Sequence, residues 1–299
     1  MPTLLRSYVN GNTNVEIYSD GTKIRSCEGE PHPLYPESMD CKITNYCDNP
    51  LCAKWCHEMS NQDGKHADLV LGLKLLEDFP SGCELAIGGG NPLSHPDLRM
   101  FTKELSSRGV ICNLTVNSYH VKSHRGQLFE LIDKQYIKGV GISYFRRYIE
   151  DCDAVVSGTP NAVFHLILGV HTVEDLRLII ERYKNPKVLL LGFKQYGNGA
   201  TFYNPKVEAV LYQWYTNIFA FFNTENLVLS FDNLAIKQLN LRRLFPKEEW
   251  EKFYMGDDGT FTMFLDLVER NYTTSSTSSK RFNLGEEDTI QKIFAKIKQ

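Results

Sequence analysis

The sequence lacks the features that mark several common protein classes. No apolar run in its 299 residues is long enough to span a membrane, and residues 1–12 do not form the charged segment and apolar core of a signal peptide. The formal net charge is −3 and the sequence pI is near 6.3, so no overall positive charge favours nonspecific binding to nucleic acids or membranes. We therefore expect a cytoplasmic protein with no membrane partner.

The sequence also lacks a second group of closely spaced cysteines. Of its eight cysteines, three stand within ten residues, and those further along the chain are scattered. Without a signal peptide, this number of cysteines indicates a reducing compartment and not a disulfide framework. We interpret four of the separate cysteines as buried apolar thiols: Cys41, Cys83, Cys112 and Cys152.

The three clustered cysteines are the most informative feature of the chain. Cys47, Cys52 and Cys56 follow a short alternating run at 41–44 and precede a helix-period run at 67–79, which places them in a strand-to-helix loop. Three thiolates in one loop can hold three irons of a 4Fe-4S cluster and leave the fourth iron open to a ligand that is not protein. The alternative is a Cys3His zinc site completed by His57, although structural zinc sites usually draw their ligands from two separated pairs.

A glycine-rich segment follows the next predicted strand. The apolar run at 85–87 indicates a buried strand, and Gly88, Gly89 and Gly90 come directly after it, followed by Asn91 and Pro92. A side chain at these glycines would block the close approach of a ligand to the backbone. The alternative is an ordinary glycine turn before the next helix.

Period-2 and helix-period runs alternate along the first two thirds of the chain, which predicts an α/β fold with parallel strands. The predicted strands lie at 41–44, 85–87, 111–117, 140–144, 161–169 and 187–194. Helices are predicted at 67–79, 127–134 and 173–183. We expect an N-terminal β-hairpin around Asp20-Gly21 and an extended proline-containing linker at 31–39.

Three segments follow from this pattern. Residues 1–36 are the hairpin and linker, residues 37–204 the (β/α) core, and residues 205–299 a C-terminal α+β extension. In the extension we expect a buried aromatic helix at 207–222, strands at 226–231 and 261–267, and a terminal helix at 288–297. Six parallel strands leave one side of a barrel open, so the extension should close the barrel and shape the substrate site.

The cysteine loop resembles that of the radical S-adenosylmethionine (radical SAM) enzymes. Trp55 stands just before the third cysteine, as an aromatic residue does in that family, but the spacing here is Cys-x4-Cys-x3-Cys where three and two residues are usual. Asn91 and Pro92, with the two glycines before them, align with the family's Gly-Gly-Glu-Pro segment, which receives the amino group of SAM. Asn91 replaces the glutamate and supplies no charge.

The resemblance implies a partial (β/α)6 barrel, a 4Fe-4S cluster, SAM, and an electron donor such as flavodoxin or ferredoxin. The cluster would cleave SAM reductively to a 5'-deoxyadenosyl radical that takes hydrogen from the substrate. It further implies contacts to SAM at strand ends, here Asn117, Ser143 and Gly169, for which ordinary loop hydrogen bonding or a glycine bend is the alternative.

Two polar residues near strand ends are the predicted substrate contacts. Lys194 ends the sixth strand and Asp232 follows the strand at 226–231. The alternative places them as solvent-exposed residues at the rim. The slightly acidic charge favours a peptide or small metabolite over a nucleotide or nucleic acid as the substrate. A non-catalytic iron-sulfur or zinc protein on the same scaffold is the hypothesis from another functional class.

Overall fold

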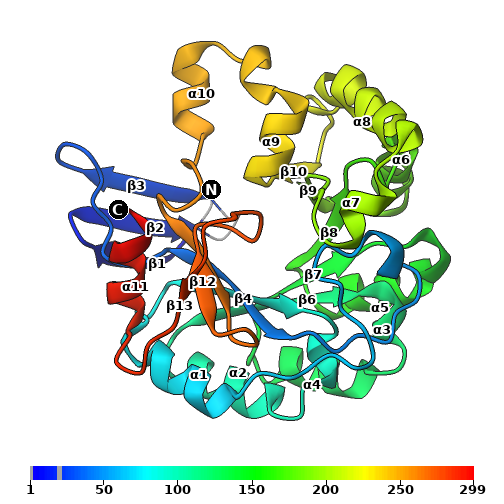
Figure 1. Ribbon diagram of the computed structural model, residues 1–299. Coiled ribbons are helices and arrows are strands. Elements are labelled where there is room, and N and C mark those ends of the chain that lie inside the picture. Colours follow the sequence, from blue (N-terminus) through cyan, green and yellow to red (C-terminus); the bar gives the residue numbers. More distant parts are fainter. Residues whose placement is uncertain (1–2, 19–21) are drawn as a thin grey trace.

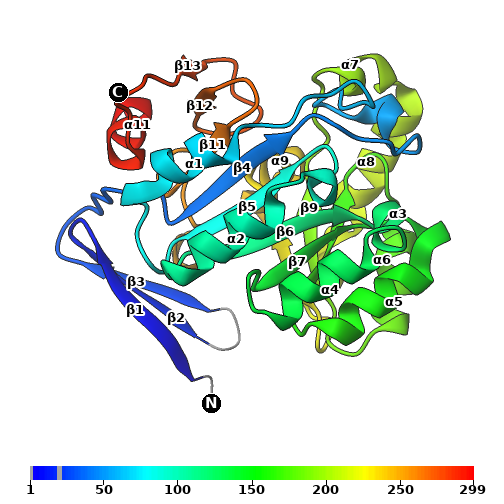
Figure 2. The same cartoon turned by 90° about the horizontal axis from the view of Figure 1, so that it is seen from below.

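The computed structural model describes residues 3–18 and 22–299. A small antiparallel sheet stands beside a large, curved, mostly parallel sheet that helices cover on its outer face (Figures 1 and 2). Among the described residues, no helix combines the length and the apolar composition needed to cross a membrane.

The N-terminal sheet contains three strands, β1 (Leu4–Asn10), β2 (Thr13–Tyr18) and β3 (Lys23–Cys27). β2 and β3 form the predicted antiparallel hairpin, but its turn at Asp20-Gly21 lies outside the described residues. β1 adds a strand that the sequence pattern did not predict. Charged side chains fasten this sheet to the start of the large sheet: Arg25 Nη2 lies 2.7 Å from Glu37 Oε2 and Lys23 Nζ lies 3.1 Å from Glu84 Oε1.

The large sheet has the order β10-β9-β8-β7-β6-β5-β4-β11-β12-β13. Its strands are β4 (Ser38–Thr44), β5 (Glu84–Gly89), β6 (Ile111–Asn117), β7 (Gly139–Ser143), β8 (Ala162–Ile167), β9 (Lys187–Leu191), β10 (Val228–Phe231), β11 (Thr262–Asp266), β12 (Asn271–Thr273) and β13 (Phe282–Asn283). All neighbouring strands from β10 through β4 to β11 are parallel. The last two pairings are antiparallel.

The six predicted core strands are present, and the C-terminal segment extends the same sheet at both edges. β10 pairs with β9, with Val228 opposite Lys187, and β11 pairs with β4, with Phe264 opposite Asp40. Eight strands of the described residues are therefore parallel, two more than the repeat pattern indicated. Both were predicted as strands of the extension, at 226–231 and 261–267, but their place in the parallel sheet was not predicted, because β11 follows β10 only after α9 and α10 and joins the opposite edge.

Helices and 3-10 turns connect the strands. The helices are α1 (Leu69–Leu75), α2 (Leu98–Ser107), α3 (Ser118–Val121), α4 (Arg125–Asp133), α5 (Ile149–Gly158), α6 (Val173–Arg182), α7 (Asn198–Phe202), α8 (Pro205–Asn217), α9 (Asn233–Leu239), α10 (Lys247–Phe253) and α11 (Ile290–Ile297). α11 confirms the predicted terminal helix. α8 confirms the predicted aromatic helix, but only one side of that region is buried: Trp214 is fully buried, whereas 67% of Tyr212 and 57% of Phe219, just beyond α8, are exposed.

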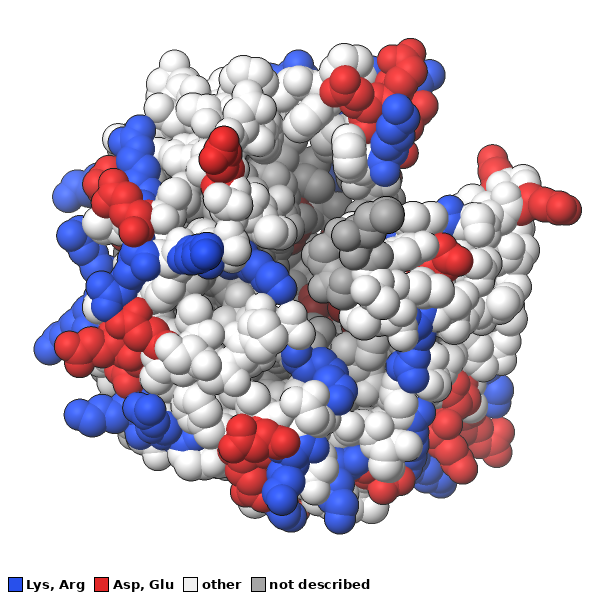
Figure 3. Space-filling view, turned by 180° about the vertical axis from the view of Figure 1, so that it is seen from behind, with Lys and Arg blue, Asp and Glu red and all other residues white. Residues whose placement is uncertain are grey.

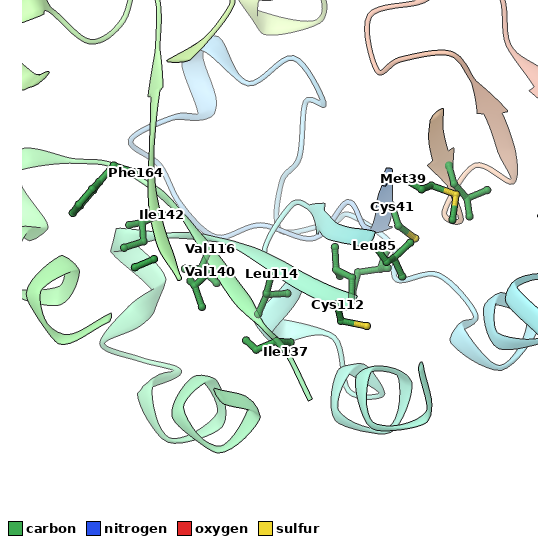
Figure 4. Close-up of a cluster of buried hydrophobic side chains, with 14 of the residues drawn as sticks. Met39, Cys41, Leu85, Cys112, Leu114, Val116, Ile137, Val140, Ile142 and Phe164 are labelled. Carbon is green, nitrogen blue, oxygen red and sulfur yellow. The ribbon is translucent and has the colours of Figure 1, made fainter. Parts of the chain in front are cut away.

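The hydrophobic core lies between the sheet and its outer helices (Figure 4). Strand alternation sends Cys112, Leu114 and Val116 of β6 into this layer, and Cys41 of β4 joins them. The separate cysteines are core thiols as predicted, since Cys41, Cys83, Cys112 and Cys152 are all buried. The alternate positions of each strand face the inside of the curved sheet, where polar side chains gather.

Candidate functional site

The three clustered cysteines lie in the loop between β4 and α1, at the carboxyl end of the first core strand. Backbone hydrogen bonds shape this loop, from Cys47 N to Asn61 O (2.8 Å) and from Cys56 N to Ala53 O (3.3 Å). A 3-10 turn, Ala53–Trp55, separates the second and third cysteines. Asn49 Oδ1 accepts the N–H of Leu51 at 2.9 Å, so the lengthened spacing is accommodated by a local side-chain turn.

The three thiols lie close enough to influence one another electrostatically. Burial and then the neighbouring Cys47 and Cys56 raise the pKa of Cys52 to about 12, and burial chiefly raises the pKa of Cys47. Such thiols stay protonated unless a positive metal centre compensates the thiolates. Among the described residues, no three His, Cys, Asp or Glu side chains are grouped tightly enough for a single metal ion. A 4Fe-4S cluster binds each thiolate through a different iron, so its ligands stand further apart than those of a single zinc ion.

Trp55 holds the loop against the end of the barrel. Its ring centroid lies 5.4 Å from that of Phe202 in α7 and 6.0 Å from that of Phe145 beyond β7. Asn198 at the start of α7 adds a hydrogen bond from Nδ2 to Ala53 O (2.8 Å). The loop therefore reaches across the strand ends to lie beside α7 (Figure 2).

The glycine segment after β5 packs directly on the backbone of the cysteine loop. A Cβ on Gly89, which has φ +119°, would lie 2.3 Å from Thr44 O, and a Cβ on Gly90 would lie 2.1 Å from Tyr46 O. The N–H groups of Gly90 and Asn91 donate to these same two carbonyls, at 2.8 and 2.6 Å. Two of the three glycines thus permit close approach of protein backbone. Space is left only at Gly88, where a Cβ would meet nothing nearer than 3.9 Å.

Asn91 is buried beside this contact with its side chain unsatisfied. The residue is 1% exposed, and neither Oδ1 nor Nδ2 has a hydrogen-bond partner among the described residues. A buried amide without partners is costly, so it usually marks a position that another molecule completes. An amide oxygen can accept from an ammonium group, which fits the expected amino group of SAM.

The predicted strand-end residues occupy different surroundings. Asn117 donates from Nδ2 toward Cys52 Sγ at 3.9 Å and accepts the N–H of Tyr119 at its Oδ1, so it contacts a clustered cysteine. Ser143 ends β7 and is half-buried. Gly169 has φ +80°, and a Cβ there would lie 2.7 Å from Val207 Cγ1 of α8. Packing against α8 therefore accounts for that glycine.

The side chains of Lys194 and Asp232 both make hydrogen bonds to other residues of the protein. Lys194 Nζ donates to Ser276 Oγ at 2.8 Å and lies 3.2 Å from His57 Nε2. Asp232 caps α9, since its Oδ1 accepts the N–H groups of Ala235 (2.6 Å) and Gly192 (2.9 Å). The Asp232 side chain also lies near Lys194.

Asp40 is an interior carboxylate that the sequence analysis missed. It lies on the inward face of β4, opposite Ala86 of β5 and Phe264 of β11, and solvent reaches it although protein surrounds it. Burial raises the pKa of its carboxyl group, while the Lys194 ammonium lowers it. The alternation of buried Met39, Cys41 and Ile43 could have revealed it, because the residues between them must face the other way.

The face seen in Figure 3 is hollowed, and side chains of both charge signs lie around the hollow. No single sign dominates this face, in keeping with the small net charge. Asp40 on the inward face of β4 is exposed, so solvent reaches the interior of the sheet.

A buried charged network also escaped the sequence analysis. Lys42 Nζ contacts Glu58 Oε2 at 2.6 Å and Asp266 Oδ2 at 2.9 Å, and Glu58 Oε1 lies 3.2 Å from His57 Nε2. Burial and then the Lys194 ammonium lower the pKa of His57 to about 4, so its imidazole is neutral at pH 7. His57 therefore interacts with Glu58 and Lys194 through Nε2, which does not favour the zinc alternative.

A second polar pair holds the lengthened part of the loop. His120 Nε2, in α3 just after β6 and 1% exposed, lies 2.8 Å from Asp48 Oδ1 directly after the first cysteine. The pair ties the loop to the third core strand. The spacing of the cysteines gave no sign of it, because the two residues are far apart in the sequence.

No protein-family model matches the sequence, and no curated protein matches it. Solved structures of SuiB from Streptococcus suis match the fold. The structure bound to S-adenosylmethionine has a TM-score of 0.62 and 11% identity, over 88% of this chain and 66% of that one. This chain has the fold of SuiB.

Two further SuiB structures agree with this fold. The one bound to the precursor peptide SuiA gives a TM-score of 0.58 and 12% identity over 86% of this chain and 64% of that chain. A third SuiB structure has a TM-score of 0.61 and 10% identity, over 95% of this chain and 85% of that chain. The chain thus spans slightly less than two thirds of SuiB in the two ligand-bound structures.

The glycine contact predicts the effect of a single methyl group. Replacing Gly90 by Ala puts a Cβ against Tyr46 O, so we expect Gly90→Ala to lower the free energy of unfolding by about 2–4 kcal/mol. Gly126→Ala is the matched control, because nothing lies within 4 Å of its Cβ, and a helical alanine changes stability by no more than about 1 kcal/mol. Urea unfolding measures both. Equal stability of the Gly90 variant and the native protein would contradict the contact.

Proposed function

We propose that this protein is a radical SAM enzyme that modifies a peptide. The observation that supports this most directly is the packing of a loop with three mutually close cysteines against the buried, unpartnered Asn91. Both lie at the carboxyl end of a parallel barrel sheet, the end at which such barrels carry their active sites. The fold match to SuiB bound to S-adenosylmethionine agrees with this assignment.

The residues would divide the work as follows. Cys47, Cys52 and Cys56 would hold the cluster, and Asn91 would accept from the amino group of SAM through its amide oxygen. When bound, the cluster and SAM together supply the one-electron chemistry that removes a hydrogen atom from a substrate. Gly88, Gly90 and Pro92 shape the backbone that presents Asn91, and Asn117 contacts the second cysteine.

The chain's own contribution is positioning and the exclusion of water. Trp55 and its aromatic neighbours cover the loop on the α7 side, and Ser143 and Gly169 lie at strand ends that face the same rim. Burial raises the pKa of the Cys47 and Cys52 thiols, and iron binding would release their protons.

A peptide substrate agrees with the open interior of the sheet. Within the described residues, the large sheet has two edges, β10 and β13, that do not pair with each other. An extended chain could therefore enter beside Asp40, Asp232 and Lys194. The match to SuiB bound to the precursor peptide SuiA favours a peptide over a small metabolite or nucleotide.

The cluster assignment makes a direct prediction. Anaerobic reconstitution with iron and sulfide should give about four irons per chain, and replacing any one of Cys47, Cys52 and Cys56 by Ala should abolish the brown absorbance. Cys27→Ala is the control, because that thiol is exposed on the small N-terminal sheet. Binding of one zinc ion and no iron by the native protein would refute the proposal.

The role of Asn91 predicts a change in SAM affinity. Asn91→Glu would turn a neutral acceptor into a charged one, and we expect it to tighten SAM binding by about 1 kcal/mol, roughly fivefold in Kd. Asn91→Ala should weaken binding by a similar factor. Calorimetry on the reconstituted protein measures both. Ser107→Ala, at the end of α2, should leave Kd unchanged. Unchanged affinity in both Asn91 variants would remove Asn91 from the SAM site.

The interior polar residues predict a separation of two activities. Asp40→Asn should lower peptide modification by about tenfold while leaving SAM cleavage within about twofold, because Asp40 does not contact the glycine segment. Lys194→Ala should lower peptide modification by a similar factor and SAM cleavage as well, because Lys194 also contacts His57 beside Cys56. Reduced enzyme, SAM and a mixed-sequence synthetic peptide library would be followed by mass change and by 5'-deoxyadenosine release. Asp257→Asn, on the exposed surface, is the control. Full modification by both interior variants would place the substrate elsewhere, and Asp232→Ala should also cost stability as a lost cap.

A further inference from the structure

Lys42 is a buried ammonium group between two distant parts of the chain. It lies on the inward face of β4 and is 5% exposed. On one side it contacts Glu58, two residues after Cys56, and on the other it contacts Asp266 at the end of β11. The C-terminal extension is thereby joined to the end of the cysteine loop through a single side chain.

Asp266 is held rigidly in this arrangement. Its Oδ1 accepts the N–H groups of Val268 at 3.0 Å and Glu269 at 2.9 Å, which leaves Oδ2 to face Lys42. The carboxylate therefore has a fixed direction set by the turn after β11. Lys42 itself lies on β4, so Lys42 and Asp266 are both anchored in the large sheet.

The ion pairs of Lys42 neutralise two buried carboxylates that would each cost free energy if they were buried without a cation. Glu58 and Asp266 are carboxylates with little exposure, and removing Lys42 would leave both buried without a cation. Lys42 Nζ lies 2.6 Å from Glu58 Oε2, so the position of Glu58 depends on Lys42.

A second connection runs from the same loop to the extension. His57 Nε2 lies near Lys194 Nζ, which donates to Ser276 Oγ in the loop after β12. A lysine ammonium group only donates hydrogen bonds, so Nε2 accepts from Lys194. Two side-chain routes thus reach residues 57–58 from the extension, one through Asp266 and one through Ser276.

We propose that Lys42 is a positioning residue for the third cysteine, through which the C-terminal extension holds the cysteine loop in place. The inference rests on the proposed function, because it assigns Cys56 to the cluster. The segment after Cys56 has few other restraints: Cys56 O accepts from Met59 N at 3.2 Å and from Asn198 N at 3.3 Å. Losing the Lys42 contact should free this end of the loop more than the Cys47 end, which His120 and Asn61 hold separately.

A buried ion pair at the other end of β4 provides the matched control. Arg25 contacts the buried Glu37 just before the strand begins, at 2.7 Å. Breaking that pair should destabilise the fold to a similar extent, but it lies far from the cysteines along the strand. If Lys42 had a purely structural role, replacing Lys42 and replacing Arg25 would have the same effect on the reactivity of Cys56.

The test compares Lys42→Met, Asp266→Asn and Arg25→Met in the intact chain. The first readout is the rate of iodoacetamide alkylation at each cysteine of the metal-free reduced protein, followed by mass spectrometry with N-acetylcysteine as reference thiol. We expect the Cys56 rate to rise about tenfold in the Lys42 and Asp266 variants, with a smaller change at Cys47. Arg25→Met should leave the Cys56 rate within about twofold of the native value.

The second readout is the electron paramagnetic resonance spectrum of the reduced, reconstituted cluster with and without SAM. Altered spectra in the Lys42 and Asp266 variants, and a native spectrum in Arg25→Met, would support the proposal. Equal Cys56 alkylation in all variants would overturn it. If Lys42→Met does not fold, the Cys56 alkylation rates of Asp266→Asn and Glu58→Gln test the proposal in its place. Failure of the native protein to bind a cluster would refute the proposed function alone, because alkylation is measured without metal.

Discussion

The arrangement of the site depends on a contact between two stretches of backbone. The carbonyls of Thr44 and Tyr46, at the start of the cysteine loop, accept the N–H groups of Gly90 and Asn91 after β5. These bonds form only because Gly89 and Gly90 have no side chain to keep the two segments apart. The contact fixes the loop with three cysteines relative to the segment expected to bind SAM, so neither half of the site can shift without the other.

Around this contact the protein tolerates polar groups that do not help it to fold. The amide of Asn91, Nδ1 of His120 and Nδ2 of Asn49 are buried without partners among the residues that the structure describes. Each lies in or against the cysteine loop, and each costs free energy in the isolated chain. Buried groups left unsatisfied at one rim of a well-packed sheet are the expected mark of a place where another molecule binds.

The C-terminal segment belongs to the same sheet as the core. β10 extends one edge and β11 the other, so residues beyond 204 lie beside the first and the last of the six predicted strands. This placement brings Asp266 and Ser276 to Lys42 and Lys194, and thereby to the residues after Cys56. A part of the chain without a recognisable motif therefore contacts the most recognisable one, which links the expected substrate side of the barrel to its cysteines.

The local sequence determined the features that depend on near neighbours. Strand and helix periods predicted the parallel core and placed the three cysteines in a strand-to-helix loop. The adjacent glycines were predicted to let a ligand approach the backbone, and Gly89 and Gly90 let the protein's own cysteine loop approach it. Tertiary structure alone decided which distant side chains meet. The pairing of Lys42 with Asp266, the inward direction of Asp40 and the bond between His120 and Asp48 depend on strand register and sheet order. A charged residue in the sequence does not reveal its partner, because the partner depends on which distant strands pair and in which register. Asp266, for example, stands opposite Lys42.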